Sequence, residues 1–379
     1  MKCLARHDPA PGKPCLVTTR EDPVTTLKRT LLGAVAIAAA VVLQPAFAGQ
    51  ADYNAVFPGI LMDKDIKPTG QEMKPVTKDN RPLKVGFLPT AMDTYYQRVL
   101  AGVKEEIDKR GGADQIELLV QAPSSQSATD DQIRAMEAWI NDGVDAIAVA
   151  LYNEGALLPS IRRATEAGIP IFLFNSPVAD NPYYVSDIGY DQSDGGRAQA
   201  QWLVDTYGDK EVKIGILEGL PGPHTSQRMK GFNEIISKHP NFKIVAEQPA
   251  GWVRAQGLSV TENMFTAHPD IEVLVALYDE MALGGLQALK AKGLNGKVAI
   301  VGYENMKEAN DAILTGDFAA TVDTGAKEEG RNIIRAVDEF LMKGHPLPKK
   351  IFVAPKTYDA KNIKTFDQSD YVYVQQPKT

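Results

Sequence analysis

The chain has 379 residues, 44% hydrophobic and 23% charged, which is the composition of a soluble globular protein with room for two domains. It excludes collagen-like, coiled-coil and extensively disordered chains. Outside residues 1–48, 45 acidic and 35 basic residues remain, a balance of −10 against −7 for the whole chain. This negative balance argues against nucleic acid as a partner, because phosphate binding requires Lys and Arg.

The first feature in chain order is an apolar run, Leu31–Leu43, preceded by Lys28-Arg29 and followed by the small-x-small pattern Ala46-Phe47-Ala48. This arrangement predicts a secretory signal peptide, residues 1–48. The run is shorter than the roughly 20 residues of a membrane-spanning helix, so we expect no membrane anchor. The long stretch before it indicates a translation start assigned too far upstream, with synthesis beginning near Val24.

Both cysteines, Cys3 and Cys15, lie in the segment that is expected to be removed. The mature chain, beginning at Gly49, would then have no disulfide, no thiolate metal site and no Cys nucleophile. It would also lack a Cys that could carry a lipid. We therefore expect a soluble periplasmic protein.

Residues 49–82 are polar, contain four prolines and show no clear periodicity, which predicts an N-terminal arm or linker. From Leu83 onward, short β-branched runs alternate with amphipathic segments. The expected strands are 84–88, 115–122, 146–150 and 169–174, and the expected helices are 95–110, 129–141 and 157–167. Repeated strand–helix–strand units predict a parallel sheet covered by helices on both faces.

The same rhythm begins again after residue 190. The expected helices are 195–207, 226–238, 254–267, 279–292, 309–315 and 327–343, and the expected strands are 212–218, 243–248, 273–276, 299–302, 318–322 and 351–354. Two such units in tandem predict an α/β protein of two Rossmann-like lobes with parallel sheets. Because ligands bind such sheets outside the carboxyl ends of the strands, we expect a site in the cleft between the lobes.

Several segments occur in the order known from one protein family: Ala164–Ile171, His268–Ile271, Asp279–Gly284, Val301–Glu304 and Phe318–Val322. With them the chain resembles the periplasmic sugar-binding proteins of the ribose-binding type, which are solute receptors of ABC transporters. The resemblance covers roughly residues 83–355.

The resemblance implies a type I periplasmic binding protein fold, in which a three-stranded hinge joins two lobes that close on a ligand. The crossovers would lie near Gly189–Asp191, Asp323–Gly325 and Ala354–Thr357. The first lobe would then contain residues 83–189 and 325–354. The second lobe would contain residues 190–323 and 355–379.

The family's ligand residues can be placed one by one in the first lobe. Tyr95 and Tyr96 stand where two aromatic residues enclose a sugar ring, and Asp93 precedes them where an amide is common. After the fourth strand, where the family often has an Asp-Arg pair that binds hydroxyl groups, this chain has Asn175 and Ser176. The resemblance therefore implies a site without the family's characteristic hydroxyl clamp.

Seven further ligand residues are implied in the second lobe and the hinge: Arg228, Trp252, Tyr278, Tyr303, Glu304, Asp323 and Thr324. Arg228 lies three residues before a Gly-Phe pair, as in the family, and Trp252 follows the Gln-Pro-Ala stretch. Tyr278 replaces an Asn that is common there. Asp323 and Thr324 stand at the second crossover, where the family frequently has Gln.

Aromatic rings that cover C–H faces and planar polar groups that bind hydroxyls suit a sugar or polyol. The same residues have structural alternatives: one of the two neighbouring tyrosines could belong to the core, Arg228 to a structural ion pair, and Asp93 to a helix cap. Several aromatic rings with nearby acids also suit a cationic small molecule held in an aromatic cage. Both classes of ligand remain open from the sequence.

Nothing in the sequence indicates an enzyme, and we expect no catalytic residues, no cofactor and no metal site. Nucleophile-elbow, dinucleotide and phosphate-loop motifs are absent from the sequence. The five histidines, His7, His224, His239, His268 and His345, lack metal-ligand spacing and are expected at the surface or at helix caps. We expect a monomer that delivers its ligand to an ABC transporter permease. The alternative is a sensory receptor that docks on a chemoreceptor or a sensor kinase.

Overall fold

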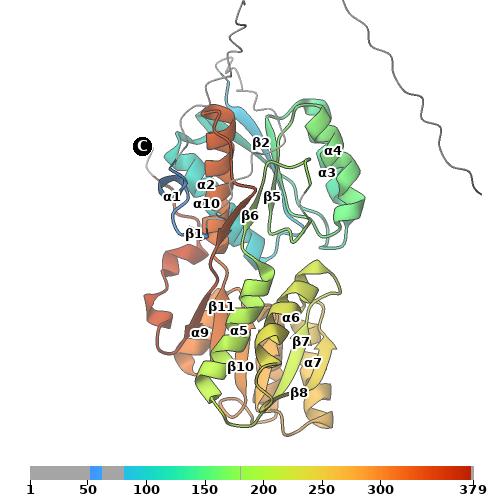
Figure 1. Ribbon diagram of the computed structural model, residues 1–379, viewed down its shortest axis with the longest axis vertical. Helices are drawn as coiled ribbons and strands as arrows, with labels where there is room; N and C mark the ends of the chain where they lie inside the picture. The colour runs from blue at the N-terminus through green and yellow to red at the C-terminus, as the bar shows by residue number, and fades with distance from the viewer. Residues whose placement is uncertain (1–51, 62–80, 180, 377–379) are drawn as a thin grey trace, which may run out of the picture. The chain divides into compact units, whose positions relative to one another are not determined.

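The computed structural model describes residues 52–61, 81–179 and 181–376 (Figure 1). The expected signal peptide, residues 1–48, lies outside the described residues, as do residues 62–80 of the expected arm. The described chain forms two sheets, each covered by helices. We call each sheet with its helices a lobe.

The sheet of the first lobe has the strand order β1-β12-β6-β5-β4-β2-β3, and its neighbours are parallel except for β1 and β12. Its strands are β1 (Ile60–Leu61), β2 (Leu83–Leu88), β3 (Ile116–Val120), β4 (Ala146–Val149), β5 (Ile171–Phe174), β6 (Ser186–Gly189) and β12 (Lys350–Val353). Its helices are α1 (Tyr53–Val56), α2 (Thr94–Lys109), α3 (Thr129–Asp142), α4 (Glu154–Glu166) and α10 (Ala326–Val337). A π-helical turn, Asp338–Met342, extends α10.

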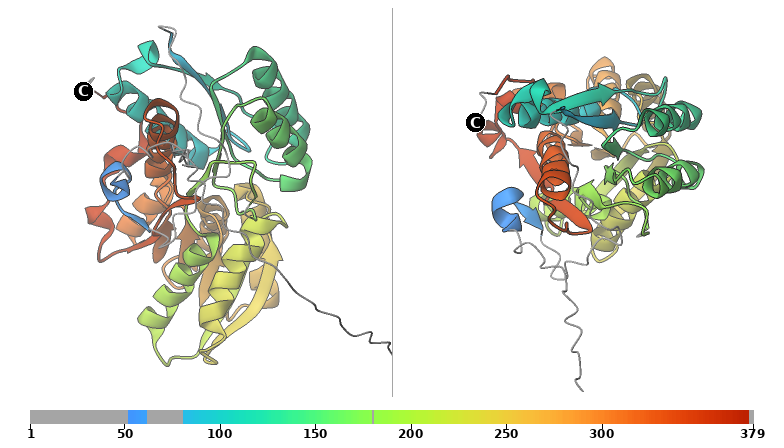
Figure 2. Two further views of the ribbon diagram at one scale, coloured as in Figure 1. Left: turned by 45° about the horizontal axis from the view of Figure 1, so that its top comes forward. Right: turned by 90° about the horizontal axis from the view of Figure 1, so that it is seen from above.

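Helices cover both faces of this sheet, as the strand sequences require (Figures 1 and 2). Ala146 and Ala148 of β4 belong to the core cluster beneath α2 and α10. Ile147 and Val149 face the opposite cluster, beneath α3 and α4. All four side chains are fully buried, which explains why β4 is a continuous apolar run instead of an alternating one.

The sheet of the second lobe has the strand order β13-β11-β10-β9-β7-β8, in which only β13 is antiparallel to its neighbour. Its strands are β7 (Val212–Glu218), β8 (Phe242–Pro249), β9 (Val273–Ala276), β10 (Ala299–Tyr303), β11 (Ala320–Asp323) and β13 (Lys356–Asp359). Its helices are α5 (Gln192–Tyr207), α6 (Pro223–Ile236), α7 (Arg254–Ala267), α8 (Asp279–Ala291) and α9 (Lys307–Thr315).

The predicted fold class is confirmed: two α/β lobes with parallel sheets are joined by three chain segments. The chain leaves the first sheet after β6, returns to it after β11 and leaves it again after β12. Within the second lobe, α5 and α6 pack backbone to backbone. A Cβ atom at Gly196 would lie 1.9 Å from the Arg228 carbonyl oxygen, and one at Gly231 would lie 1.9 Å from the Ser193 oxygen. Glycine at both positions thus sets the position of α6.

Short elements at the hinge and the sheet edges were absent from the sequence prediction. In the segment that we expected to be an arm, Tyr53 and Phe57 are buried in the core of the first lobe, and Ile60 pairs with Val353. Strand β6 was not predicted, because Ser186–Gly189 has only one aliphatic residue and no alternation. A single helical turn and strands of two to four residues are too short to show a periodicity.

The C-terminal tail, residues 363–376, contacts both lobes. Ile363 and Phe366 belong to the core cluster of the second lobe. Beyond them, the carbonyl groups of Ser369 and Val372 accept hydrogen bonds from Lys327 Nζ of α10 in the first lobe, at 2.7 and 2.8 Å. The tail, which we expected to be part of the second lobe, thus continues from that lobe onto the first.

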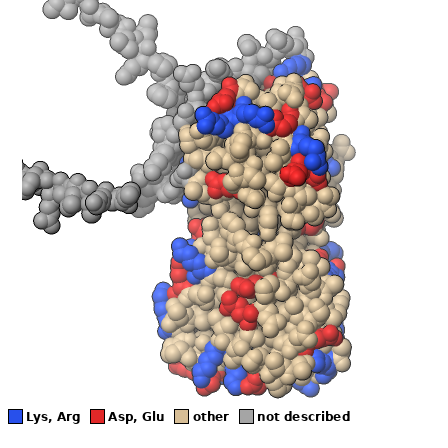
Figure 3. All heavy atoms as spheres, turned by 90° about the vertical axis from the view of Figure 1, so that its right-hand side faces the viewer, with Lys and Arg blue, Asp and Glu red and all other residues tan. Residues whose placement is uncertain are grey.

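Within the described part of the chain, no helix combines the length and the apolar character needed to cross a bilayer. On the face shown in Figure 3, basic and acidic side chains of the described residues are interspersed, and neither sign forms a continuous patch.

Candidate ligand-binding site

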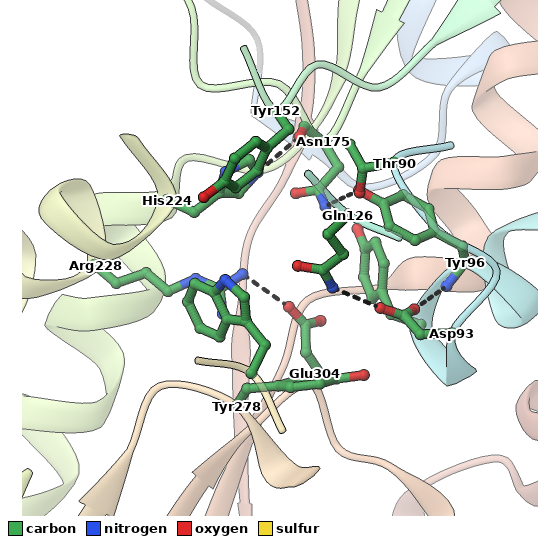
Figure 4. Close-up of a pocket in the computed structure, with 12 residues that line it drawn as sticks. Thr90, Asp93, Tyr96, Gln126, Tyr152, Asn175, His224, Arg228, Tyr278 and Glu304 are labelled. Carbon is green, nitrogen blue, oxygen red and sulfur yellow. Dashed lines mark hydrogen bonds and ion pairs between the residues drawn. The ribbon is translucent and has the colours of Figure 1, made fainter. Parts of the chain in front are cut away.

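A cavity of about 440 Å³, partly open to solvent, lies between the two lobes at the carboxyl ends of their strands (Figure 4). The first lobe contributes Thr90, Asp93, Tyr95, Tyr96, Gln126, Tyr152 and Asn175, and the second lobe contributes His224, Arg228, Trp252, Tyr278 and Glu304. A ligand in this cavity would contact both lobes.

Asp93 stands at the start of α2, and its carboxylate has two neutral partners. Oδ1 accepts a hydrogen bond from the backbone N–H of Tyr96 at 3.1 Å, the arrangement of a helix N-cap. Oδ2 accepts one from Gln126 Nε2 at 3.1 Å. Burial raises the pKa of the Asp93 carboxyl group. Asp93 is therefore both the N-cap of α2 and part of the cavity wall.

The hydroxyl group of Tyr96 is held by the first lobe in a way that leaves its hydrogen available. Its oxygen accepts a hydrogen bond from Thr90 Oγ1 at 3.0 Å and another from Asn175 Nδ2 at 3.2 Å. Because both lone pairs are used, the O–H can donate to a ligand. The neighbouring ring of Tyr95 packs edge-on against Tyr96 with 5.1 Å between the ring centroids, and its hydroxyl donates to Glu329 at 2.8 Å.

Arg228 of α6 is held by four acceptors. Its Nε donates to Gln192 Oε1 at 2.7 Å and its Nη1 to the carbonyl group of Leu277 at 2.5 Å. Its Nη2 donates to Tyr190 Oη at 2.7 Å and to Glu304 Oε1 at 3.0 Å. Both charged side chains of this ion pair are at most 5% exposed. One Nη1 hydrogen remains for a ligand.

The ring of Trp252 packs near the guanidinium group of Arg228, and both residues belong to the second lobe. Its ring lies 5.3 Å from Arg228 Cζ and packs edge-on against Tyr278, with 6.2 Å between centroids. The backbone of Trp252 is left-handed, with φ of 67°, and its ring lies directly against Gly219. A Cβ atom at Gly219 would lie 1.9 Å from that ring, so only glycine allows this position.

Hydrogen bonds cross from lobe to lobe beside the cavity, among them one from Gln192 Nε2 to Asn175 Oδ1 at 2.8 Å. The His224 Nε2 atom lies 3.0 Å from the Asn175 carbonyl oxygen, and Tyr152 Oη donates to the Pro221 carbonyl oxygen at 3.3 Å. Burial lowers the pKa of His224 to about 4, and Arg228 acts in the same direction. His224 is therefore neutral at pH 7, and we infer that Nε2 carries the hydrogen that Asn175 accepts. These contacts belong to a closed arrangement of the lobes.

Eight of the eleven residues expected to bind ligand line the cavity: Asp93, Tyr95, Tyr96, Asn175, Arg228, Trp252, Tyr278 and Glu304. Their contact with a ligand stays a prediction. The hydroxyl of Ser176, next to Asn175, serves the backbone: Leu151 N–H donates to it and it donates to the Phe174 carbonyl, both at 2.8 Å.

The other three expected residues, Tyr303, Asp323 and Thr324, do not line the cavity but support residues that do or hold the hinge. The Tyr303 ring centroid lies 4.0 Å from the Arg228 guanidinium carbon. The hydroxyl of Thr324 donates to Glu304 Oε2. Asp323 forms an ion pair with Arg98 of α2 at 3.2 Å.

Four cavity residues were missed by sequence reasoning: Thr90, Gln126, Tyr152 and His224. Thr90 and Tyr152 follow β2 and β4 closely, so the rule that ligands bind at carboxyl ends of strands could have indicated them. Gln126 lies in the loop between β3 and α3 and had no such signal. His224, expected at the surface or at a helix cap, stands in the first turn of α6 and is half-buried in the cavity wall.

No group of three or more His, Cys, Asp or Glu side chains within the described ranges has an arrangement that could hold a metal ion. The chemistry that the cavity supports is hydrogen bonding and stacking. Ring faces, one guanidinium group, two carboxylates and several hydroxyl and amide groups surround it.

Comparison with known proteins gives a consistent result. Residues 85–345 match the family model described as a periplasmic binding protein domain. A xylitol-binding protein of Mycolicibacterium smegmatis is 32% identical over 256 residues, 66% of this chain and 71% of the relative. The ribose import binding protein of Bacillus subtilis is 28% identical over 253 residues, 66% of this chain and 79% of the relative.

Solved structures are similar over most of the chain. A periplasmic solute-binding protein of an Actinobacillus succinogenes ABC transporter, with bound D-allose, has a TM-score of 0.68 at 28% identity and covers 76% of this chain and 100% of that protein. The binding protein of a Shewanella arabinose ABC transporter, bound to L-arabinofuranose, has a TM-score of 0.68 at 29% identity and covers 74% and 93%.

Proposed function

Because the chain belongs to the periplasmic binding protein family, we propose that it is the solute receptor of an ABC importer and encloses a sugar or polyol between its lobes. The observation that carries the proposal is the cavity itself, whose wall comes from both lobes. Tyr95, Tyr96 and Trp252 offer ring faces to C–H groups. Asn175, Arg228 and Glu304 offer polar groups to hydroxyls.

The lining of the cavity and the ligands of related proteins support a single small polyhydroxy compound. The cavity is lined by twelve residues from the two lobes, a wall that suits one monosaccharide or a short polyol. The relatives are named for xylitol and ribose, and two similar structures contain D-allose and L-arabinofuranose.

The mechanism is a population shift between open and closed lobes. A ligand that contacts both lobes only in the closed form stabilises that form by the difference between its affinities for the two forms. The closed form is then the species that a membrane partner recognises. No bond in the ligand has to break, and the residues of the cavity act by binding alone.

Calorimetric titration tests the proposal. The protein, purified from the periplasm after expression of the full chain, is titrated with pentoses, hexoses and polyols. We expect binding of at least one of them, with a decrease in the radius of gyration in solution scattering when that ligand is added. Absence of binding to every sugar and polyol would refute the proposal.

We also propose export by a cleaved signal peptide, a monomeric state and delivery to a permease. The support is the Leu31–Leu43 run before Ala48 and the periplasmic membership of the family. Mass spectrometry of the periplasmic protein should give an N-terminus at Gly49, and light scattering should give one chain per particle. Deletion of the gene should abolish uptake of the labelled ligand; unchanged uptake would favour the sensory alternative.

A further inference from the structure

The charges that face the cavity do not balance. The ionisable acid and base groups of the wall are the carboxyl groups of Asp93 and Glu304, the guanidinium group of Arg228 and the imidazole of His224, which is neutral because burial lowers its pKa to about 4. Arg228 is already paired with Glu304 at 3.0 Å. The wall therefore has one carboxylate more than it has cations, and that carboxylate belongs to Asp93.

Arg228 has little capacity left for an anionic ligand. Four of its five N–H hydrogens are used by protein acceptors, and its guanidinium carbon lies 5.3 and 4.0 Å from the ring centroids of Trp252 and Tyr303. A ligand carboxylate would have to compete with Glu304 for it. Bidentate binding of an anion, which needs two free N–H groups, is not available here.

Asp93 has hydrogen-bond donors but no cationic partner. Within the residues that the structure describes, no Lys, Arg or His forms an ion pair with it, and its two donors are the neutral groups of Tyr96 and Gln126. Burial penalises its charged form, as the raised pKa shows. A cation placed beside a buried carboxylate relieves this penalty, whereas a second anion increases it.

Tyr278 adds an unused polar group to the same cavity. Its hydroxyl has no hydrogen-bond partner among the described residues, although the side chain is only 6% exposed. Figure 4 shows Tyr278 reaching from the second lobe across the cavity toward the Asp93 side. A buried hydroxyl without a partner costs free energy that a ligand hydroxyl or amine can recover.

From this balance, and building on the proposed function, we propose that the site accepts neutral and amine-bearing sugars or polyols and rejects the corresponding acids, with Asp93 as the residue that determines this selectivity. The ligand places a hydroxyl or ammonium hydrogen near the Asp93 carboxylate and a polar group at the Tyr278 hydroxyl. The rings of Tyr95 and Tyr96, which follow Asp93 at the start of α2 and line the same cavity, favour a cation there.

Calorimetry with matched triplets tests the proposal: glucose, glucosamine and glucuronate; galactose, galactosamine and galacturonate; and xylitol, its terminal amine and xylonate. In the triplet that binds best, the amine should bind at least as tightly as the neutral compound. The acid should bind about a hundredfold more weakly, or worse, because a like charge faces it in a buried site.

Asp93→Asn is the decisive variant, since Asn caps a helix as well as Asp does and the fold should persist. It should bring the acid to within about tenfold of the neutral compound and remove any preference for the amine. Asp311→Asn, which removes an exposed charge from α9, is the matched control and should leave all ratios unchanged. Thermal melts by circular dichroism establish that each variant is folded.

Two results would overturn the proposal while leaving the proposed function intact. One is equal affinity of the wild type for the neutral compound and its acid. The other is a folded Asp93→Asn variant with the wild-type ratio of acid to neutral affinity. If only a sugar outside these triplets binds, the same comparison is made with the amine and the acid of that sugar; if no sugar or polyol binds, the proposed function is refuted and this inference is refuted with it.

Discussion

Lys327 connects the C-terminal tail to the first lobe beside the hinge. Its Nζ lies 2.6 Å from Glu105 Oε1 and donates to the carbonyl groups of Ser369 and Val372 at 2.7 and 2.8 Å. The side chain is 1% exposed. Because Ile363 and Phe366 are packed in the other lobe, the lobes can separate on this side only as far as the contacts between the tail and the first lobe allow, and Lys327 makes two of them.

The substitution Lys327→Met keeps the length of the side chain and removes its charge and its donors. Removing one partner of a buried ion pair costs about 3–5 kcal/mol when the other partner is left alone. Here Arg331 remains 2.9 Å from Glu105 Oε2, and the two freed carbonyl groups lie in a tail that water can reach. We therefore expect the free energy of unfolding to fall by about 2–3 kcal/mol.

Urea unfolding measures this loss, and solution scattering of the ligand-free protein measures the separation of the lobes. The variant should have a larger radius of gyration than the wild type, because one of the contacts that hold the tail to the first lobe is lost, while those of Arg98 with Asp370 and of Glu105 with the Val374 N–H remain. Lys307→Met is the control: its ion pair with Asp311, at 2.8 Å, is exposed on both sides and should contribute about 0.5 kcal/mol or less. A loss no greater than that of the control, with an unchanged radius, would refute the reasoning.

Three further predictions concern the cavity. Trp252→Ala should weaken ligand binding by more than about tenfold in calorimetry with little effect on the fold, since it removes one wall of the site; unchanged affinity would exclude this ring from ligand contact. Gly219→Ala should destabilise the protein by about 1–3 kcal/mol in urea unfolding and weaken binding, because the new methyl group would meet the Trp252 ring, whereas Gly155→Ala, at an exposed position of α4, should be neutral or slightly stabilising. The third concerns pH: closure lowers the pKa of His224 from the ordinary value of about 6.5 to about 4, so affinity should be complete above about pH 6.5 and fall as the pH decreases, by about tenfold at pH 5.5. This decrease in affinity at low pH should be smaller in the His224→Gln variant. Equal pH profiles of affinity for the wild type and the variant would contradict the role given to His224.

Much of the fold could be predicted from the sequence because the signals are local. The runs Ala146–Val149 and Val273–Ala276 are continuous and apolar, and each is buried on both faces of a parallel sheet. A strand that ends in such a sheet places the next residues at its carboxyl edge, and Tyr278 and Glu304 follow strands in this way. Chain order and strand ends were therefore sufficient to predict the position of the cleft, whereas most residues of its wall were implied by the resemblance to the ribose-binding family.

Two neighbouring residues show what could not be predicted from the sequence. Tyr303 and Glu304 both stand at the end of β10, but only Glu304 lines the cavity, while Tyr303 lies beneath Arg228. Glu304 has a φ of 94°, a backbone conformation that no periodicity predicts. Which of two adjacent side chains faces a ligand depends on this backbone turn and on what fills the space behind it.

Other features exist only because distant segments meet. His224 reaches the carbonyl group of Asn175 from the opposite lobe, and Asp323 is held by Arg98 of the first lobe. Lys327 connects the C-terminal tail to a lobe that we did not expect it to touch.

The sequence by itself determined the alternation of strands and helices, the two lobes and the position of a polar, aromatic cleft at the strand ends, because hydrophobic periodicity acts over a few residues. The tertiary structure decided which residues face that cleft, which hold the hinge and which charge has no partner. Those properties depend on distances between side chains that are far apart in the chain, and no local sequence pattern predicts them.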